Sequence, residues 1–150
     1  MDRRSFIKKA GFAGAGIAAS TALSAPAIAQ DNQTWRMVTT WPKNFPGLGV
    51  GAQRLGDRIT AASGGRLTIQ VYAGGELVPP LQALDAVIDG AAEMSHGAAY
   101  YWQNKTQALN FFTGVPFGMT SRELTGWVRY LGGQEIWDEI YDLFGVQGFL

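Results

Sequence analysis

A glycine-rich segment, TTWPKNFPGLGVGAQRLGDRI at residues 39–59, lies between an apolar alternation and a helix-like pattern. Gly47, Gly49 and Ala52 match the GxGxxA spacing of a dinucleotide-binding turn, in which backbone N–H groups at the start of a helix hold the pyrophosphate. The segment therefore raises the hypothesis of an exported, nucleotide-dependent oxidoreductase with a Gly-rich loop at residues 47–52.

Two spacings argue against a phosphate loop. In a dinucleotide-binding turn the first strand leads directly into the glycines, whereas residues 41–46 (WPKNFP) intervene here. The second strand should end on an acidic residue that holds the ribose, but it ends at Tyr72 and Ala73, and Glu76 comes only later. We therefore interpret the glycines as turn and helix-start residues, and keep the oxidoreductase as the alternative hypothesis.

Aromatic residues that follow two predicted strands are the stronger candidates for a binding site. Trp41 and Phe45 lie in a loop that Pro42 and Pro46 keep out of the sheet. Ligands of open α/β sheets bind outside the carboxyl ends of the strands, which is where this loop emerges. Trp41 is either a pocket wall or a residue that plugs the core, and both interpretations stay open.

A second aromatic group follows a short strand expected near residues 93–97. A phenol of Tyr100 or Tyr101 could hydrogen-bond a carboxylate or a carbonyl group. Neighbours in an extended chain face opposite ways, so we expect one of them to contact a ligand and the other the core. His96, at the end of the same strand, is interpreted as a satisfied, partly buried imidazole rather than a catalytic base.

The chain shows no grouping of residues that supports catalysis or a metal site. It has no Cys and a single His, and no Ser/His/Asp set, HExxH, P-loop or EF-hand spacing. Four acidic residues have spacings that suggest a cation site, but the solvated face of a helix is the simpler account: Glu135, Asp138, Glu139 and Asp142. We therefore expect no enzyme activity, and neither a metal nor a cofactor in this chain.

The periodicity of apolar residues predicts alternating strands and helices. Strands are expected at residues 34–40, 67–72 and about 93–97, and helices at 50–62, from 80 to 89, from 121, and around 136–144. The positions expected to face the core in these helices are Ala52, Leu55, Ile59, Ala62, Leu81, Leu84, Val87, Ile88, Leu124, Trp127, Val128, Leu131, Ile136, Ile140 and Phe144.

This order of elements predicts an α/β fold, with a parallel or mixed sheet and flanking helices. Thr120 and Glu123 fit a capping box at the start of the third helix. Residues 146–150 look like the start of another strand and carry no terminating signal. We therefore expect the chain to be cut off inside a larger protein.

Residues 1–29 have the features of a twin-arginine (Tat) export signal. Arg3 and Arg4 precede SFIKK, a run of small and apolar residues follows, and AIA fits a cleavage site after Ala29. We expect export to the periplasm by the Tat machinery. The whole chain has twelve Lys and Arg and twelve Asp and Glu, and removing residues 1–29 takes away four of the basic residues and one Asp. The remaining eight basic and eleven acidic side chains give a formal charge of −3, which favours neither nucleic acid nor an anionic membrane.

Taken together, these residues resemble the periplasmic solute-binding proteins of tripartite ATP-independent periplasmic (TRAP) transporters, and among them the α-keto acid-binding, TakP-like group. The resemblance covers residues 30–150. Its most specific parts are the Trp-Pro loop, GGELVPPLQALDAV at residues 74–87 and VPFGM at residues 115–119.

The resemblance implies a periplasmic binding protein-like, two-lobe α/β fold, of which residues 30–150 form mainly the first lobe, truncated at Leu150. The lobes close on a small organic carboxylate, such as pyruvate, another 2-oxo acid or a related hydroxy acid, and deliver it to a membrane permease. The arginine that clamps the carboxylate, and the ligands of a Na⁺ or Ca²⁺ bound with it, are expected beyond Leu150. A homodimer is expected, if at all, only of the full-length protein.

The resemblance also assigns first-lobe contacts to residues of this chain. Trp41 and either Tyr100 or Tyr101 are the main ones. Asn44, Phe45 and Phe117 follow as further candidates.

Overall fold

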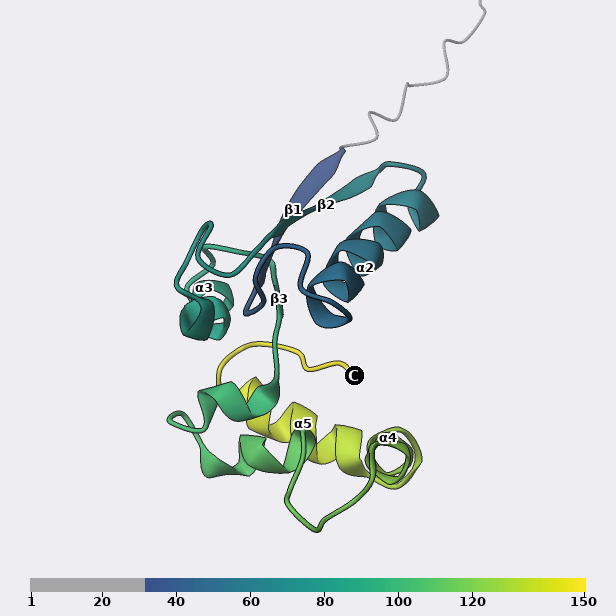
Figure 1. The fold of residues 1–150 in the computed structure, drawn as a ribbon, viewed down its shortest axis with the longest axis vertical. Helices are drawn as coiled ribbons and strands as arrows, with labels where there is room; N and C mark the ends of the chain where they lie inside the picture. The colour runs from purple at the N-terminus through teal and green to yellow at the C-terminus, as the bar shows by residue number, and fades with distance from the viewer. Residues whose placement is uncertain (1–31) are drawn as a thin grey trace, which may run out of the picture. The chain divides into compact units, whose positions relative to one another are not determined.

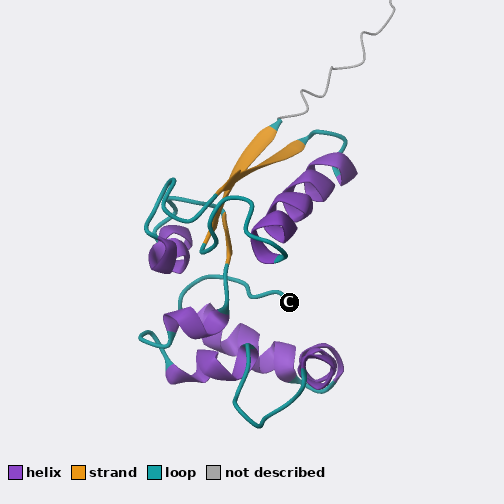
Figure 2. Ribbon diagram, viewed as in Figure 1, coloured by secondary structure: helices purple, strands orange, loops and turns teal. Residues whose placement is uncertain are grey.

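The structure is a computed structural model that describes residues 32–150. The expected export signal, with Arg3, Arg4 and the cleavage site after Ala29, lies outside these residues. The elements in chain order (Figure 1) are β1 (Gln33–Thr39), α2 (Leu48–Ala62), β2 (Leu67–Tyr72), η1 (Pro80–Gln82), α3 (Ala83–Ile88), β3 (Met94–His96), η2 (Ala99–Trp102), η3 (Gln107–Phe112), α4 (Ser121–Tyr130) and α5 (Gly133–Asp142). The elements labelled η are 3₁₀ helices. The predicted alternation of strands and helices is confirmed through β3, after which the described chain is helical (Figure 2).

The described strands form one parallel sheet in the order β2-β1-β3. In the register, Val38 of β1 lies opposite Tyr72 of β2, and Thr39 lies opposite His96 of β3. After β1 the chain forms β2 on one side of β1, and then crosses to form β3 on the other side. The carboxyl ends of β1 and β3 therefore form a topological switch point, the place where open α/β sheets bind ligands.

Both faces of the sheet are covered by helices. Met37 packs in a cluster with Ala52 of α2 and Ile69, whereas Val38 belongs to a larger cluster that includes Leu84 of α3. Figure 1 shows α2 and α3 on opposite sides of the strands. Successive side chains of a strand face opposite ways, so residues 37–39 of β1 are buried on both faces as predicted, whereas residues 33–35, including Trp35 at 37%, are exposed.

Helix α2 faces the sheet with smaller residues than the sequence pattern predicts. Ala52 and Gly56 are its buried residues. A Cβ on Gly56 would lie 2.9 Å from Val71 Cγ2, so the helix and β2 are in close contact there. The prediction that Leu55 and Ala62 face the core is wrong, because this close approach turns both of them toward solvent.

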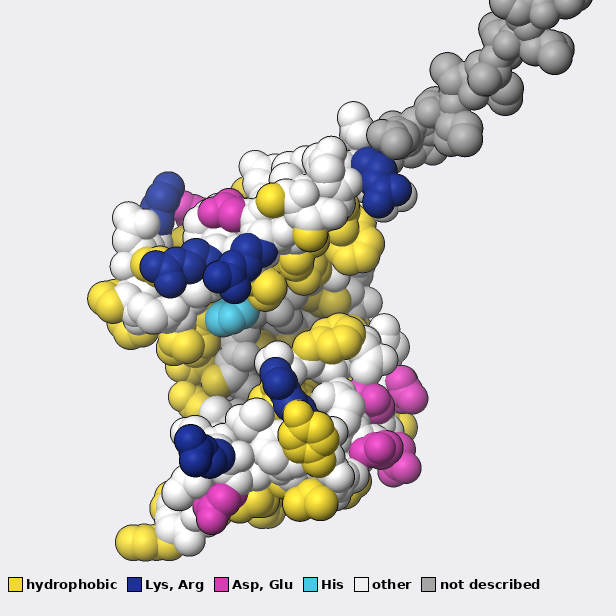
Figure 3. Space-filling model, turned by 90° about the vertical axis from the view of Figure 1, so that its right-hand side faces the viewer, with side chains coloured by type: hydrophobic (Ala, Val, Ile, Leu, Met, Phe, Trp, Pro, Cys, Tyr) yellow, Lys and Arg dark blue, Asp and Glu magenta, His cyan; other side chains and the backbone are white. Residues whose placement is uncertain are grey.

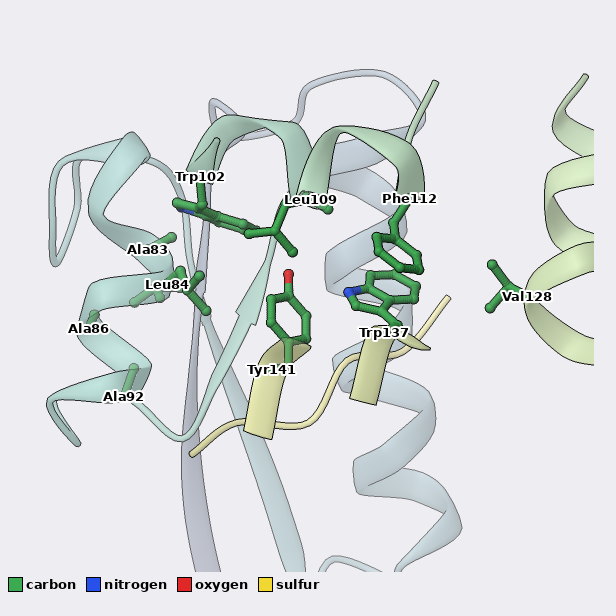
Figure 4. Close-up of a cluster of buried hydrophobic side chains, with 12 residues drawn as sticks. Ala83, Leu84, Ala86, Ala92, Trp102, Leu109, Phe112, Val128, Trp137 and Tyr141 are labelled. Atoms are coloured by element: carbon green, nitrogen blue, oxygen red, sulfur yellow. The ribbon is translucent and has the colours of Figure 1, made fainter. Parts of the chain in front are cut away.

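The part of the larger cluster that lies between η3, α4 and α5 is rich in aromatic rings. The Phe112 ring of η3 stacks on Trp137 of α5, with centroids 4.9 Å apart, and on Trp127 of α4 at 5.5 Å. Figure 4 shows the Phe112 and Trp137 rings face to face. Tyr141 belongs to α5, as does Trp137. The buried face of α5 consists of Gly133, Trp137 and Tyr141.

Three residues that the sequence pattern places in the core are exposed instead. Ile136 was expected to be buried but is exposed, because the Trp137 and Tyr141 rings occupy the core side of α5. Leu131 is exposed because α4 has ended before it. Leu81 is exposed in the short η1 turn, and α3 buries Ala83, Leu84 and Ala86 instead.

The capping box before α4 is confirmed. The Thr120 hydroxyl accepts from the Glu123 backbone N–H, and the Glu123 carboxylate accepts from the Thr120 backbone N–H at 2.8 Å. These two hydrogen bonds satisfy backbone donors that the start of a helix leaves unpaired. The Glu123 carboxylate accepts from the Thr120 backbone N–H and also from the Thr120 hydroxyl, and these two bonds, in that order, lower the pKa of Glu123.

The strand-like run predicted at residues 146–150 is not a strand. Instead of pairing with a strand, its backbone is hydrogen-bonded to a side chain of α5: the Gly148 carbonyl accepts from Gln134 Nε2 at 2.8 Å. A Cβ on Gly148 would lie 2.6 Å from the Tyr141 ring, so this segment packs directly on α5. Alternation of apolar residues alone did not reveal this close packing.

An ion pair ties β1 to the turn before β3. Arg36 Nη2 lies 2.7 Å from Glu93 Oε1, and the Arg36 backbone N–H donates to Glu93 Oε2. The hydrogen bond from the Arg36 side chain, followed by that from its backbone, lowers the pKa of Glu93 to about 2.

Within residues 32–150, no helix is long and apolar enough to cross a membrane.

Candidate functional site

The backbone of Trp41 is fixed at the carboxyl end of the central strand. Its carbonyl accepts from the backbone N–H of Gly74 at 2.8 Å and from the Thr39 hydroxyl at 3.1 Å. The preceding Thr40 N–H donates to the His96 carbonyl at 3.1 Å, which extends the pairing of β1 with β3. Trp41 is thus held by residues that follow or belong to all three strands.

The Trp41 side chain is hydrogen-bonded to His96. Its Nε1–H donates to His96 Nδ1 over 2.7 Å, and the indole is only 8% exposed. Because Nδ1 accepts this bond, the imidazole is neutral and carries its proton on Nε2. Burial lowers the pKa of His96, which favours the same neutral form. The expectation of a partly buried imidazole with a hydrogen-bond partner is confirmed.

Other predicted site residues surround the same indole. The Trp41 ring stacks on Phe45, with centroids 6.4 Å apart and planes inclined by 16°, and packs against Tyr101 at 5.9 Å. Tyr101 in turn contacts Tyr100 at 4.6 Å. We call this group the aromatic wall; it consists of Trp41, Phe45, His96, Tyr100 and Tyr101. In Figure 3 the chain's single histidine is visible at the surface, below a group of basic side chains.

The two tyrosines lie in the 3₁₀ helix η2, so the premise that they occupy an extended chain is wrong. Tyr101 is partly buried against the larger core cluster, as expected of one of the pair. Tyr100 is 38% exposed. The interaction with the Tyr100 phenol, followed by burial, raises the pKa of Tyr101, so the Tyr101 phenol stays protonated at neutral pH and can donate. A ligand contact of Tyr100 stays a prediction.

Asn44 shapes the loop of the aromatic wall through its backbone. It has φ of 61° in a turn that the Phe45 N–H closes by donating to the Pro42 carbonyl at 3.1 Å. Asparagine tolerates this left-handed conformation better than most residues. The Asn44 side chain is exposed. Its predicted ligand contact therefore stays a prediction, next to a clear conformational role.

The glycines at the start of α2 shape the preceding loop and the first turn of the helix. Gly47 has φ of 78°, and a Cβ on Gly49 would lie 2.9 Å from the Pro42 carbonyl oxygen. The Leu48 N–H donates to Pro46 O, and the Val50 N–H donates to Phe45 O. Donors that would have to face a phosphate are used within the loop, which confirms the interpretation as turn and helix-start residues.

Phe117 is not joined to the aromatic wall by any ring contact found among the described residues. It is fully exposed, with φ of 60°, in the loop between η3 and α4. Beside this loop lies an apolar cavity of about 460 Å³ between η3, α4 and α5, lined by residues such as Phe111, Trp127 and Ile140. This lining lacks charged side chains that could hold a carboxylate, so the strand ends are the better candidate site.

The acidic residues of α5 do not assemble into a metal site. Glu135, Glu139 and Asp142 are exposed. Asp138 Oδ1 accepts from Gln134 Nε2 at 2.8 Å and from Gln147 Nε2 at 2.5 Å. No group of three or more potential metal ligands occurs in residues 32–150. The solvated-face interpretation agrees with this exposure.

Comparison with known proteins places this arrangement in a family. The model of the bacterial extracellular solute-binding protein family 7 (DctP) matches residues 37–149. The chain belongs to this family. The matched region contains every residue of the aromatic wall. It also contains the Gly-rich segment, so the family assignment and the geometry of the glycines agree.

The relatives include one protein named for its ligand. The monocarboxylate 2-oxoacid-binding periplasmic protein of Nostoc sp. is 42% identical over 118 residues, which cover 79% of this chain and 32% of the relative. The match lies far above chance similarity and includes most of the described residues. The chain spans about a third of the length of this relative.

Two solved structures of TRAP periplasmic solute-binding proteins share the fold. A TRAP periplasmic solute-binding protein from Pseudoalteromonas atlantica, with bound sodium and pyruvate, is 38% identical with a TM-score of 0.74, covering 76% of this chain and 35% of that one. A second, from Colwellia psychrerythraea with bound calcium and pyruvate, is 36% identical with a TM-score of 0.76, and the match covers 79% of this chain and 36% of that one. The expectation of a periplasmic binding protein-like α/β fold is confirmed, and the described residues correspond to part of it.

Sequence reasoning missed the residues that position Trp41. The Thr39 hydroxyl and the Gly74 N–H fix its carbonyl, and His96 fixes its indole. His96 was noticed, but without a partner, because the register that places it beside Trp41 is a property of the sheet. A polar residue at the end of each of two parallel strands is the signal that would have paired them.

Proposed function

We propose that this chain provides one wall of the ligand site in the periplasmic solute-binding component of a TRAP transporter. The ligand is a small organic carboxylate, a 2-oxo acid such as pyruvate or a related hydroxy acid, which the complete protein delivers to a membrane permease. The observation that carries this proposal is the likeness to a relative named for 2-oxoacid binding, which spans the aromatic wall.

The geometry supports this ligand class. The aromatic wall lies at the switch point of a parallel sheet, where open α/β folds bind ligands. Its rings offer apolar surface for a small carbon skeleton, and its phenols and imidazole offer hydrogen-bond donors for oxygen atoms. Trp41, Phe45 and one of the tyrosines are the proposed contacts, with Asn44 and Phe117 as further candidates. Two lobes closing on such a ligand would give the permease a distinct shape to recognise.

The complete protein would supply the remaining charge. A carboxylate needs a cationic or strongly donating partner, and the family structures hold sodium or calcium with pyruvate. We propose that a cation accompanies the substrate in the complete protein, held by residues outside this chain. The twin-arginine pair at Arg3 and Arg4 supports Tat export to the periplasm.

The test is a calorimetric titration of the protein expressed from its complete reading frame. Pyruvate, longer 2-oxo acids and lactate are titrated with and without sodium or calcium, with propionate as a matched acid that lacks the 2-oxygen. We expect heat from at least one 2-oxo or 2-hydroxy acid and little from propionate. No heat with any organic acid, under any cation condition, would overturn the proposal.

A further inference from the structure

His96 has one ring nitrogen committed and one available. Nδ1 accepts the Trp41 indole N–H at 2.7 Å, so the neutral ring carries its proton on Nε2. Within residues 32–150, no hydrogen bond of Nε2 is found. His96 is partly buried, but its Nε2 is not among the fully buried side-chain atoms that lack a hydrogen-bond partner. Nε2 therefore keeps some contact with solvent. The Nε2–H is therefore a donor that remains accessible.

The position of His96 matches the proposed ligand site. In the sheet register His96 pairs with Thr39, the last residue of β1, so the imidazole lies at the switch point of the sheet. The Trp41 indole lies next to both His96 and Tyr101, with its ring centroid 6.2 Å from that of the His96 imidazole and 5.9 Å from that of the Tyr101 ring. An accessible N–H at this place suits an acceptor oxygen, which is what a carboxylate or a 2-oxo group provides.

The orientation of this donor is determined by the fold. A free neutral imidazole exchanges its proton between its two nitrogens, whereas a donor at Nδ1 selects the form protonated on Nε2. Burial disfavours the imidazolium that would abolish this selection. The Trp41 indole, which is only 8% exposed, thus acts on the ligand through His96 in addition to its proposed direct contact.

We propose that His96 is a ligand-contacting residue, and that its Nε2–H, held in one tautomer by Trp41, donates to an oxygen of the bound organic carboxylate. This inference rests on the proposed function and names a polar contact in the same site. It reassigns the imidazole from a satisfied packing residue to a donor with one free position.

Two substitutions separate ligand contact from packing. His96→Asn places an amide oxygen near the former Nδ1 and keeps an acceptor for Trp41, but it has no donor at the Nε2 position. His96→Gln reaches the Nε2 position with its amide N–H₂ and gives up the acceptor at Nδ1. Pyruvate affinity is measured by calorimetry on the protein expressed from its complete reading frame, and thermal unfolding is followed in parallel.

We expect His96→Asn to keep the wild-type unfolding temperature within a few degrees and to weaken pyruvate binding about ten- to hundredfold, as for loss of a hydrogen bond to a charged acceptor. His96→Gln should unfold earlier yet bind pyruvate more tightly than His96→Asn. Wild-type affinity in His96→Asn, or equal weakening in both variants, would overturn the proposal. If the wild type binds none of the organic acids, the proposed function itself fails, and this inference fails with it.

Discussion

Trp41 Nε1 donates to His96 Nδ1 across 2.7 Å, and this side-chain hydrogen bond adds to the backbone bond from the Thr40 N–H that joins the carboxyl ends of β1 and β3. Thr39 and His96 are partners in the sheet register, so the side-chain bond continues the backbone pairing beyond the last residue of β1. Trp41 and His96 are therefore positioned in the aromatic wall by the fold itself. A preformed wall reduces the ordering cost that binding must overcome.

Removing the indole N–H should destabilise the fold at the strand ends. Trp41→Phe keeps an aromatic ring but leaves His96 Nδ1 without its donor, which we expect to cost about 1–3 kcal/mol of unfolding free energy. Trp41→Ala also empties a buried ring volume and should cost about 3–5 kcal/mol. Urea unfolding measures both values. Trp41→Phe with wild-type stability would show that the hydrogen bond contributes nothing.

The same variants test the binding role of Trp41. We expect Trp41→Ala to weaken organic acid binding in the complete protein while its far-UV circular dichroism stays unchanged, because β1 and β3 remain paired by their backbones. Affinity is measured by calorimetry at a temperature where the variant is folded. Unchanged affinity would assign Trp41 to packing alone.

Stability should fall on acidification through the ordinary range of histidine. Burial sets the folded pKa of His96 below its ordinary value of 6.5, so the unfolded chain binds a proton first as the pH falls. The contribution is fully present above pH 6.5 and is lost as the pH falls through that value toward the folded pKa. Urea unfolding between pH 8 and 5 should show a smaller decline for His96→Asn than for the wild type. Identical pH profiles would contradict this assignment.

Gly49 and Gly51 form a matched pair at the start of α2. A Cβ on Gly49 would lie 2.9 Å from the Pro42 carbonyl oxygen and 3.1 Å from Phe45 Cβ, whereas a Cβ on Gly51 meets nothing within 4 Å. We expect Gly49→Ala to cost about 1–3 kcal/mol by overpacking. Gly51→Ala should instead stabilise by about 0.5–1 kcal/mol, because alanine is the better helix former. Thermal unfolding compares the two, and a stabilising Gly49→Ala would show that the loop yields without strain.

The capping box of α4 offers a test remote from the aromatic wall. Thr120→Ala removes the side chain that accepts from the Glu123 N–H and should cost about 0.5–2 kcal/mol. Thr125→Ala is the control, because its hydroxyl donates to the Ser121 carbonyl within the helix and alanine suits a helix interior. Chemical unfolding should separate the two variants, with organic acid binding unaffected in both. Equal stability of the two variants would contradict the capping role.

Local patterns were sufficient to predict most elements. The alternation around Val38 and in residues 67–72 gave the strands, and Thr120 with Glu123 marked the start of α4. These signals depend only on neighbours in sequence. The order of elements then limited the topology to a sheet with helices on its flanks.

The finer packing depends on contacts between distant residues. Helix α2 turns Gly56 toward Val71, and α5 turns Trp137 toward Phe112, so apolar residues such as Leu55 and Ile136 face solvent. Helical periodicity alone does not state which of two apolar faces has the better partner. In the same way, Trp41 and Tyr101 were predicted site residues, but their link to His96 required the register of β1 with β3.

The most direct test of the central claim is a crystal structure of the complete protein with bound pyruvate. The claim is that the aromatic wall at the ends of β1 and β3 forms one side of the carboxylate site. We predict pyruvate oxygens within hydrogen-bond distance of His96 Nε2 or a phenol of Tyr100 or Tyr101. Pyruvate bound where none of the residues of the aromatic wall touches it would contradict the account.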